Sequence, residues 1–175
     1  MTILLVDRVS PFYSQILVGK CGSLFWCHKF RTMVLGADQT LNQWSARNPD
    51  LLDRYRQGNF KLRQDPRVTT LGRFLRRHSL DELPQFYNVL RGDMSLVGPR
   101  PLLPEEVDDY GDAIADYLTV TPGLTGLWQV NGRSETSFRE RAGFDVDYAA
   151  RWSLWLDLSI LLKTLRVVVS GRGAY

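Results

Sequence analysis

Cysteine and histidine are both scarce in this chain of 175 residues, which has two of each. Cys21 and Cys27 are separated by five residues, a spacing that fits no disulfide framework. With His28 and His78 as the only histidines, the cysteines do not make a convincing zinc site either. We therefore expect buried, reduced, structural thiols, as is usual for a cytosolic compartment.

The chain also lacks a long uninterrupted hydrophobic run. Met1–Val6 is too short for a signal peptide and shows no cleavage-site pattern. The most apolar stretch, 151–169, is interrupted by Asp157, Lys163 and Arg166, whereas a membrane-spanning helix needs about 20 mostly apolar residues. Its tryptophans and flanking cations fit a core helix or a helix at a bilayer interface, and amphipathicity alone does not separate these two.

Positive charge is in only slight excess over negative charge. Lys and Arg total 22 against 19 Asp and Glu, a net charge of +3, and the sequence pI is about 9.0. This balance suits anionic partners such as phosphosugars or an anionic lipid surface. Nucleic acid is not expected as a partner, because no helix-turn-helix, zinc-finger or RNP-type pattern is present. The length and the 44% hydrophobic content predict one globular domain over residues 1–175, in which 1–10 is a remnant preceding the main body.

Two adjacent carboxylates, Asp81 and Glu82, stand at the centre of the sequence. The apolar residues that follow recur with helical spacing, at Leu83, Phe86, Tyr87 and Leu90. The start of this helix has two interpretations. Ser79 could cap it in a capping box with Glu82, or Asp81 could be the N-cap, with Pro84 in the first turn. We favour the second, because a proline is tolerated best there.

Arginines surround the two carboxylates. Five precede the pair within twenty residues and two follow it: Arg63, Arg67, Arg73, Arg76, Arg77, Arg91 and Arg100. Guanidinium groups bind phosphates in a bidentate manner. Acidic residues at a helix start are usually simple caps, but a carboxylate pair beside phosphate-binding arginines can hold Mg²⁺, attack phosphorus, or do both.

Other segments predict an α+β fold, mostly helical, with a short N-terminal β-element and amphipathic interfacial helices. Residues 24–33 indicate a strand, with Lys29 and Arg31 on one face. Asp65-Pro66 is expected to open a helix, whose buried face would be Val68, Leu71, Phe74 and Leu75. Residues 104–117 resemble an amphipathic helix with a solvated acidic face.

Asp145 and Asp147 form an Asp-x-Asp triplet, a pattern that holds the metal in some nucleotide-sugar glycosyltransferases. Here the triplet lies in an apparently helical segment, where residues two apart do not face each other. A short motif outside its usual context is weak support for a metal site.

The motifs around the carboxylate pair closely resemble those of the bacterial sugar transferase family, the monotopic phosphoglycosyl transferases that start exopolysaccharide, capsule and O-antigen assembly. The ending resembles the undecaprenyl-phosphate galactose and glucose phosphotransferase branch, and the similarity covers nearly everything from Pro11 onward. The matching segments are 79–85, 88–101, 29–33, 65–67, 121–133 and 172–175.

The resemblance implies transfer of a sugar 1-phosphate from a UDP-sugar to polyprenyl (undecaprenyl) phosphate, with release of UMP. Asp81 would attack the β-phosphorus and form a phosphosugar-aspartyl intermediate, and Glu82 would help to hold Mg²⁺ together with Asp81. Arg76 and Arg100 match phosphate-binding arginines of the family, and Arg133 is a weaker candidate on the nucleotide side.

The resemblance also implies a place at the cytoplasmic face of the bacterial inner membrane. The family carries a hydrophobic helix ahead of the segment that matches Pro11, and only ten residues precede it here. We therefore expect a catalytic domain without that helix, bound peripherally to the membrane surface, and a homo-oligomer remains a possibility. Two alternatives stay open: a metal-dependent UDP-sugar glycosyltransferase using Asp145 and Asp147, which would release UDP, and a truncated non-catalytic remnant.

Overall fold

The computed structural model describes residues 10–47, 50, 62, 65–131 and 137–170, and its N-terminal part is an antiparallel hairpin. β1 (Phe12–Val18) pairs with β2 (Leu24–Phe30) along its whole length, with Val18 opposite Leu24. The turn contains the 3-10 segment η1 (Lys20–Gly22), where Cys21 and Gly22 have positive φ. The predicted β-element is confirmed, although β2 ends before Arg31.

Two helices follow the hairpin, α2 (Ala37–Arg47) and α4 (Thr70–Arg77). The prediction that a helix opens at Asp65-Pro66 is wrong, because the Asp65 carboxylate accepts hydrogen bonds from the backbone and guanidinium of Arg67. The helix begins instead after Thr69, whose hydroxyl accepts a hydrogen bond from the backbone N–H of Gly72. Of the predicted buried face, Val68 is buried, but Phe74 is 54% exposed.

The carboxylate pair lies in the 3-10 segment η2 (Leu80–Glu82), ahead of α5 (Gln85–Arg91). Neither predicted helix cap forms. Ser79 is in the left-handed region and its side chain makes no cap bond, while Asp81 is inside η2 and α5 begins after Pro84. α5 ends at Gly92, whose φ of 83° is the left-handed conformation typical of a helix C-terminus.

A second, parallel sheet pairs β3 (Ser95–Val97) with β4 (Gly123–Thr125). Between them lie η3 (Pro104–Glu106), η4 (Asp108–Tyr110) and α6 (Ala113–Tyr117). The single amphipathic helix predicted over 104–117 is therefore broken into three short pieces. Its acidic face is also not wholly solvated, because Glu106 is only 4% exposed.

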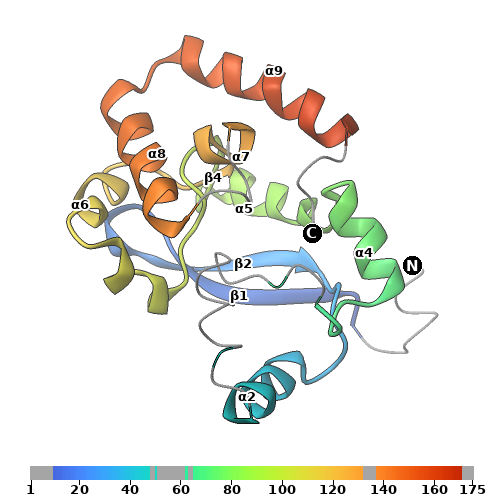
Figure 1. Cartoon of the computed structure of the whole chain (residues 1–175). Helices are drawn as coiled ribbons and strands as arrows, with labels where there is room; N and C mark the ends of the chain where they lie inside the picture. The colour runs from blue at the N-terminus through green and yellow to red at the C-terminus, as the bar shows by residue number, and fades with distance from the viewer. Residues whose placement is uncertain (1–9, 48–49, 51–61, 63–64, 132–136, 171–175) are drawn as a thin grey trace.

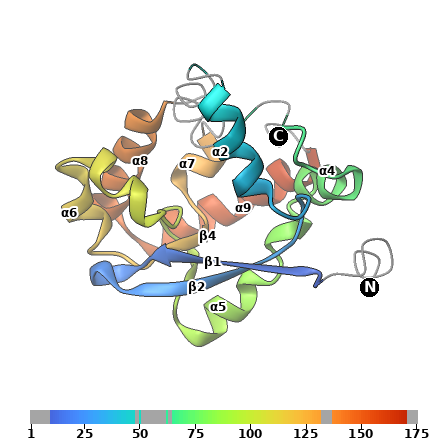
Figure 2. The same cartoon turned by 90° about the horizontal axis from the view of Figure 1, so that it is seen from below.

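The chain continues through α7 (Leu127–Asn131), α8 (Phe138–Arg151) and α9 (Leu154–Ser170). In Figure 1, α9 runs across the top of the molecule, far from α2, and Figure 2 shows α5 beside the hairpin. The fold is mixed α+β, as predicted. Among the described residues, no helix is both long and apolar enough to cross a membrane.

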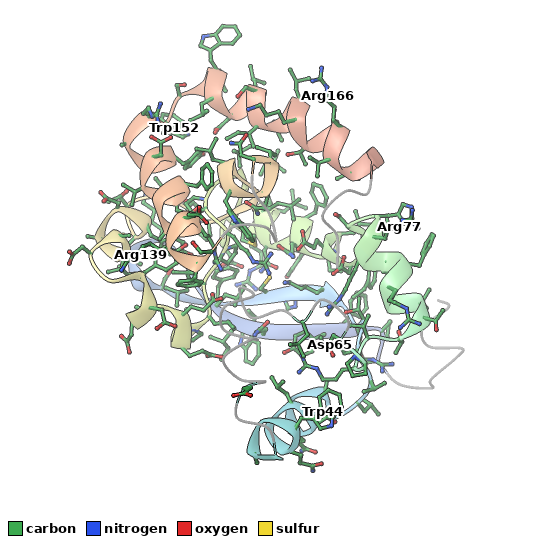
Figure 3. All side chains as sticks on the ribbon, viewed as in Figure 1. Trp44, Asp65, Arg77, Arg139, Trp152 and Arg166 are labelled. Atoms are coloured by element: carbon green, nitrogen blue, oxygen red, sulfur yellow. The ribbon has the colours of Figure 1, made fainter. Side chains whose placement is uncertain are left out.

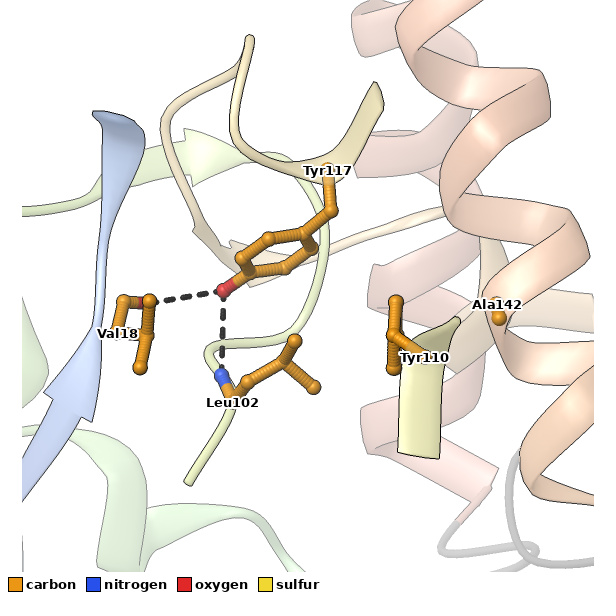
Figure 4. Packing of buried hydrophobic residues seen from close by; sticks show 5 residues of the cluster. All are labelled: Val18, Leu102, Tyr110, Tyr117 and Ala142. Carbon is orange, nitrogen blue, oxygen red and sulfur yellow. Dashed lines mark hydrogen bonds between the residues drawn. The ribbon is translucent and has the colours of Figure 1, made fainter. Parts of the chain in front are cut away.

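One core cluster ties the hairpin to the segment that carries Arg100. Tyr117 donates a hydrogen bond to the carbonyl of Val18 (2.9 Å) and accepts one from the N–H of Leu102 (3.2 Å), as Figure 4 shows. A second cluster packs the inner face of the hairpin, including Cys27, against Met94. Cys27 is thus a buried free thiol, as predicted, whereas the prediction of burial is wrong for Cys21, which is exposed in the hairpin turn.

Candidate active site

The two central carboxylates have different surroundings because they follow each other in a 3-10 turn. Such a turn advances about 120° per residue, so consecutive side chains point in different directions. Glu82 lines a pocket, and Asp81 is half-buried beside it. Burial, and then the charge of Glu82, raise the pKa of the Asp81 carboxyl, while Lys29 and Arg76 act in the opposite direction. Burial thus disfavours the charged form of Asp81, and two nearby cations partly offset this effect.

The pocket is assembled from elements far apart in the sequence. The hairpin, η2, α5, the segment after β3, and the β4–α7 region all contribute to it. Its charged members are Lys29, Glu82, Arg100 and Glu106, and its neutral amides are Gln15, Gln85 and Gln129. The Nη1 atom of Arg100 lies 3.7 Å from the Oε1 atom of Glu82. The pocket thus presents two cations and two carboxylates together, groups that can bind a metal-bound or phosphorylated ligand.

Arg76 reaches the site from the last turn of α4. Its Nε donates a hydrogen bond to the hydroxyl of Thr32 (3.0 Å), and Asp81 lies within electrostatic range. Burial lowers the pKa of Arg76, and the charge of Asp81 opposes that effect. Close approach of α4 to Thr32 depends on Gly72, because a Cβ there would lie 2.0 Å from the Thr32 carbonyl oxygen.

A buried cation, Arg141, lies behind the segment that carries Arg100. Its guanidinium donates to the backbone carbonyl of Arg100 (3.4 Å) and pairs with Glu106 (3.4 Å). The side chain is 1% exposed and is surrounded by aromatic rings, those of Tyr110, Trp128 and Phe138. Arg141 thereby links α8 to the backbone of the Arg100 segment. Sequence reasoning missed this contact, because no periodic pattern relates residues 41 positions apart.

Four of the predicted site residues come together in the structure. Asp81 and Arg76 form one neighbouring pair, and Glu82 and Arg100 form the other. Arg133, the fifth, lies outside the described residues, as do Arg63 and the matching segment 172–175.

Other arginines near the pair have structural roles. Arg67 is buried against Asp65, and Arg73 donates to the carbonyl of Val68 and the hydroxyl of Thr70. Lys29 lines the pocket, but Arg31 does not share its strand face, because it follows the end of β2 and donates to the carbonyl of Ser10. The lining amides were not foreseen, although Gln85 follows the carboxylate pair directly in the motif.

Asp145 and Asp147 do not form a metal site. Asp145 is 1% exposed and accepts a hydrogen bond from the hydroxyl of Tyr110 (2.5 Å). Asp147, two residues along α8, pairs with Arg151 on the exposed side of the helix. The carboxylates of Asp145 and Asp147 therefore do not converge on one point, as the alternative of a metal-dependent glycosyltransferase would require.

The sequence predicted Asp81 and Glu82 as Mg²⁺ ligands, and of the two only Glu82 lines the pocket. The described part of the chain contains no group of three or more His, Cys, Asp or Glu side chains arranged around one point. Mg²⁺ commonly binds to one or two carboxylates and completes its shell with water and substrate phosphate oxygens. An ion of this kind would arrive with a phosphorylated substrate, and Glu82 is the carboxylate of the pair that the pocket presents to it.

Comparison with known proteins identifies the family to which the chain is similar. The family profile described as "Bacterial sugar transferase" matches residues 1–171. The undecaprenyl-phosphate galactose phosphotransferase of Salmonella typhimurium is 48% identical over 169 residues, which cover 97% of this chain and 35% of that protein. Exopolysaccharide production protein ExoY of Rhizobium meliloti is 46% identical over 169 residues, which cover 97% of this chain and 74% of that protein.

A third relative carries a different sugar in its name. The UDP-glucose:undecaprenyl-phosphate glucose-1-phosphate transferase of Xanthomonas campestris pv. campestris is 40% identical over 173 residues, which cover 94% of this chain and 32% of that protein. This chain thus spans about a third of the length of the Salmonella and Xanthomonas proteins and about three quarters of ExoY.

Proposed function

This chain belongs to the bacterial sugar transferase family, and we propose that it transfers a sugar 1-phosphate from a UDP-sugar to undecaprenyl phosphate, with release of UMP. The observation that carries the proposal is that Glu82 and Arg100 lie 3.7 Å apart in the lining of one pocket, while the adjacent Asp81 is within electrostatic range of Lys29 and Arg76. The names of the Salmonella and Xanthomonas relatives supply the lipid phosphate acceptor. The reaction would be the first membrane step in building an exopolysaccharide, capsule or O-antigen repeat unit.

In the proposed first step, a carboxylate oxygen of Asp81 attacks the β-phosphorus of the UDP-sugar. A phosphorus–oxygen bond to Asp81 forms, the bond to the bridging oxygen breaks, and UMP leaves. In the second step an oxygen of the lipid phosphate attacks the same phosphorus and frees Asp81. The raised pKa of Asp81 supports a nucleophilic role, because a more basic carboxylate is a better nucleophile, and Lys29 and Arg76 favour its ionised form.

Asp81 and Glu82 would hold Mg²⁺ together with phosphate oxygens of the donor. The ion would neutralise the charge that develops on the diphosphate as it is cleaved. Glu82 could also move a proton, but phosphate oxygens need little proton chemistry. Arg76 and Arg100 would bind phosphate oxygens through their planar guanidinium groups, and Arg133 remains a candidate on the nucleotide side.

The lipid acceptor requires contact with a membrane, and we propose that the turn between α8 and α9 and the exposed side of α9 make it, at the cytoplasmic face. Trp152 is 60% exposed in this turn and Trp155 is 80% exposed in the first turn of α9. Figure 3 shows Trp152 and Arg166 toward the two ends of this upper edge. Exposed leucines continue the apolar surface along α9: Leu154, Leu158, Leu162 and Leu165. Amphipathic helices with aromatic residues and nearby cations bind to bilayer interfaces.

Identification of the released nucleotide tests this function. The chain is incubated with Mg²⁺, polyprenyl phosphate and each of several UDP-sugars, including UDP-galactose and UDP-glucose. Release of UMP with formation of a lipid-linked sugar diphosphate is expected for at least one donor. Release of UDP would identify a conventional glycosyltransferase, and absence of any turnover in liposomes would favour a non-catalytic role.

A further inference from the structure

We propose that Gln85 forms a sugar-binding subsite in this pocket, where its carboxamide hydrogen-bonds a hydroxyl group of the sugar being transferred. The inference deepens the proposed function and rests on it. It assigns the recognition of the sugar, as distinct from its phosphates, to a neutral side chain next to the carboxylate pair.

Gln85 is a buried polar side chain that faces the pocket. It is the first residue of α5, is only 4% exposed, and contributes to the pocket lining. Within the described part of the chain, no backbone or side-chain group forms a hydrogen bond with its carboxamide. The polar atoms of this carboxamide are not among the fully buried atoms that lack a partner in the described part of the chain. They are therefore accessible from the pocket, where solvent or a ligand can form hydrogen bonds with them.

Asn88, one turn further along α5, provides an internal comparison. It has the same carboxamide group and is fully buried on the same side of the helix. Its oxygen accepts from the N–H of His28 (3.1 Å), and its nitrogen donates to the carbonyl of Trp26 (2.7 Å) and to Asp93 (3.2 Å). The fold therefore uses Asn88 to attach α5 to the hairpin. The carboxamide of Gln85 has no such structural bonds and is available to a ligand in the pocket.

The chemistry of the carboxamide selects a hydroxyl over a phosphate. Phosphate oxygens only accept hydrogen bonds, and in this pocket the charged donors Lys29 and Arg100 bind them more strongly than a neutral amide can. A carboxamide both donates and accepts, and so does a sugar hydroxyl. Gln15 and Gln129 line the same pocket from β1 and α7, which adds neutral hydrogen-bonding groups around the same ligand.

The position of Gln85 selects the sugar over the nucleoside. Gln85 follows Glu82 by three residues and the proposed nucleophile by four. In a UDP-sugar, the sugar is attached directly to the β-phosphorus that Asp81 would attack, whereas the α-phosphate and the ribose separate that atom from the uracil. Because Gln85 lines the same pocket as Glu82, the sugar is the part of the donor closest to the attacked phosphorus that this side chain can contact.

Substitution of Gln85 by methionine tests the subsite. Gln85→Met keeps the length of the side chain and removes its hydrogen bonds. Binding of the parent UDP-sugar and of analogues lacking one hydroxyl each is measured by calorimetry with Mg²⁺ present, with UMP as the internal control. Both proteins compared carry Asp81→Asn, so that no phosphosugar adduct forms, and the one that retains Gln85 serves as the wild type. For the wild type, we expect one deoxy analogue to bind about ten- to a hundred-fold more weakly than the parent. The affinity of Gln85→Met for the parent UDP-sugar should be lower than that of the wild type by a similar factor. This variant should bind the deoxy analogue as weakly as it binds the parent, and it should bind UMP as the wild type does.

The other outcomes overturn the inference in distinguishable ways. If Gln85→Met weakens the binding of all the analogues and of UMP equally, or leaves binding unchanged, Gln85 does not hydrogen-bond a sugar hydroxyl. In that case, UMP release by the wild type would still support the proposed function. If the wild type binds no UDP-sugar, the proposed function and the subsite fail together. Thermal unfolding provides an independent readout: a ligand-binding Gln85 predicts unchanged or higher stability for Gln85→Met, and a marked loss would show a structural role.

Discussion

At the residue scale, Glu82 forms an ion pair with Arg100, while Asp81 is within electrostatic range of Lys29 and Arg76. Arg76 comes from α4 and lies near Asp81, while Arg100 comes from the segment after β3 and lies 3.7 Å from Glu82. These two arginines are separated by 24 positions in the sequence, and the fold brings them to one site. The phosphate binding proposed for these two arginines would depend on the planar fork of the guanidinium group as well as on charge.

We predict that Arg76→Lys and Arg100→Lys each slow sugar-phosphate transfer by about ten- to a hundred-fold. Lysine keeps the charge but loses the bidentate geometry, and one charge-assisted hydrogen bond is worth roughly 1.5–3 kcal/mol. The measurement is the steady-state rate with a saturating donor. Arg77→Lys is the matched control, because Arg77 is the next residue of α4 and is exposed. Changes below threefold at both positions would show that these arginines do not bind the reacting phosphates.

At the element scale, α4 must approach Thr32 closely for Arg76 to reach the site. Gly72 makes this possible, whereas Gly143 lies in α8 with open space around it. We predict that Gly72→Ala destabilises the protein by about 1–3 kcal/mol, because the added Cβ overlaps with the backbone of Thr32.

Gly143→Ala is the control for this prediction. It should stabilise the protein by about 0.5–1 kcal/mol, because alanine favours a helix interior more than glycine does. Chemical denaturation of both variants provides the test. Equal effects of the two substitutions would contradict the proposed tight contact between α4 and Thr32.

The interior of α8 should give the protein a distinct pH dependence. Burial raises the pKa of Asp145 to about 6 from a model-compound value of 3.8, although Arg141 and the Tyr110 hydroxyl favour the charged form. Since the folded-state pKa is the higher one, this group stabilises the fold fully below about pH 4, and the contribution is lost as the pH rises through 6. A shift of about two pKa units corresponds to roughly 3 kcal/mol.

The free energies of unfolding of the wild type and of Asp145→Asn, measured from pH 4 to pH 7, isolate this contribution. The stability of the wild type relative to Asp145→Asn should fall by up to about 3 kcal/mol over this range. Other groups titrate in both proteins and cancel in the difference. A constant difference would mean that Asp145 titrates normally.

The sequence predicted single helices and strands better than the tertiary contacts between them. The strand predicted over residues 24–33 corresponds to β2, whereas its partner β1 was not predicted. The predicted start of α4 was wrong because the Asp65 carboxylate accepts hydrogen bonds from Arg67 and does not cap a helix. Residue propensities do not predict this contact. The motif around Asp81 and Glu82 identified the candidate site, but the Arg141 contact to the Arg100 segment and the pocket position of Gln15 depend on tertiary packing.

At the scale of the whole molecule, the upper edge formed by α9 would contact the membrane. We predict that Trp152→Ser together with Trp155→Ser reduces binding to anionic vesicles without unfolding the protein, since both side chains are exposed. Binding should be partial and reversible, stronger with anionic lipid and weaker at high salt. Vesicle flotation at low and high salt measures it.

Trp44→Ser provides the control for membrane binding. Trp44 lies on α2, at the opposite end of the molecule from Trp152 in Figure 3, and its replacement should leave vesicle binding unchanged. If the double variant binds as well as the wild type, the α8–α9 turn is not the contact. Salt-insensitive binding would indicate a different, inserted element.

The central claim is that Asp81 carries the sugar phosphate during transfer. The most direct test is to incubate the chain with Mg²⁺ and a UDP-sugar labelled in its β-phosphate, without the lipid acceptor, and to map the trapped adduct by peptide mass spectrometry. Our account predicts one labelled site, at Asp81, that polyprenyl phosphate discharges and that is missing in Asp81→Asn, with turnover of that variant at background. A label on another residue, or near-normal turnover by Asp81→Asn, would contradict it.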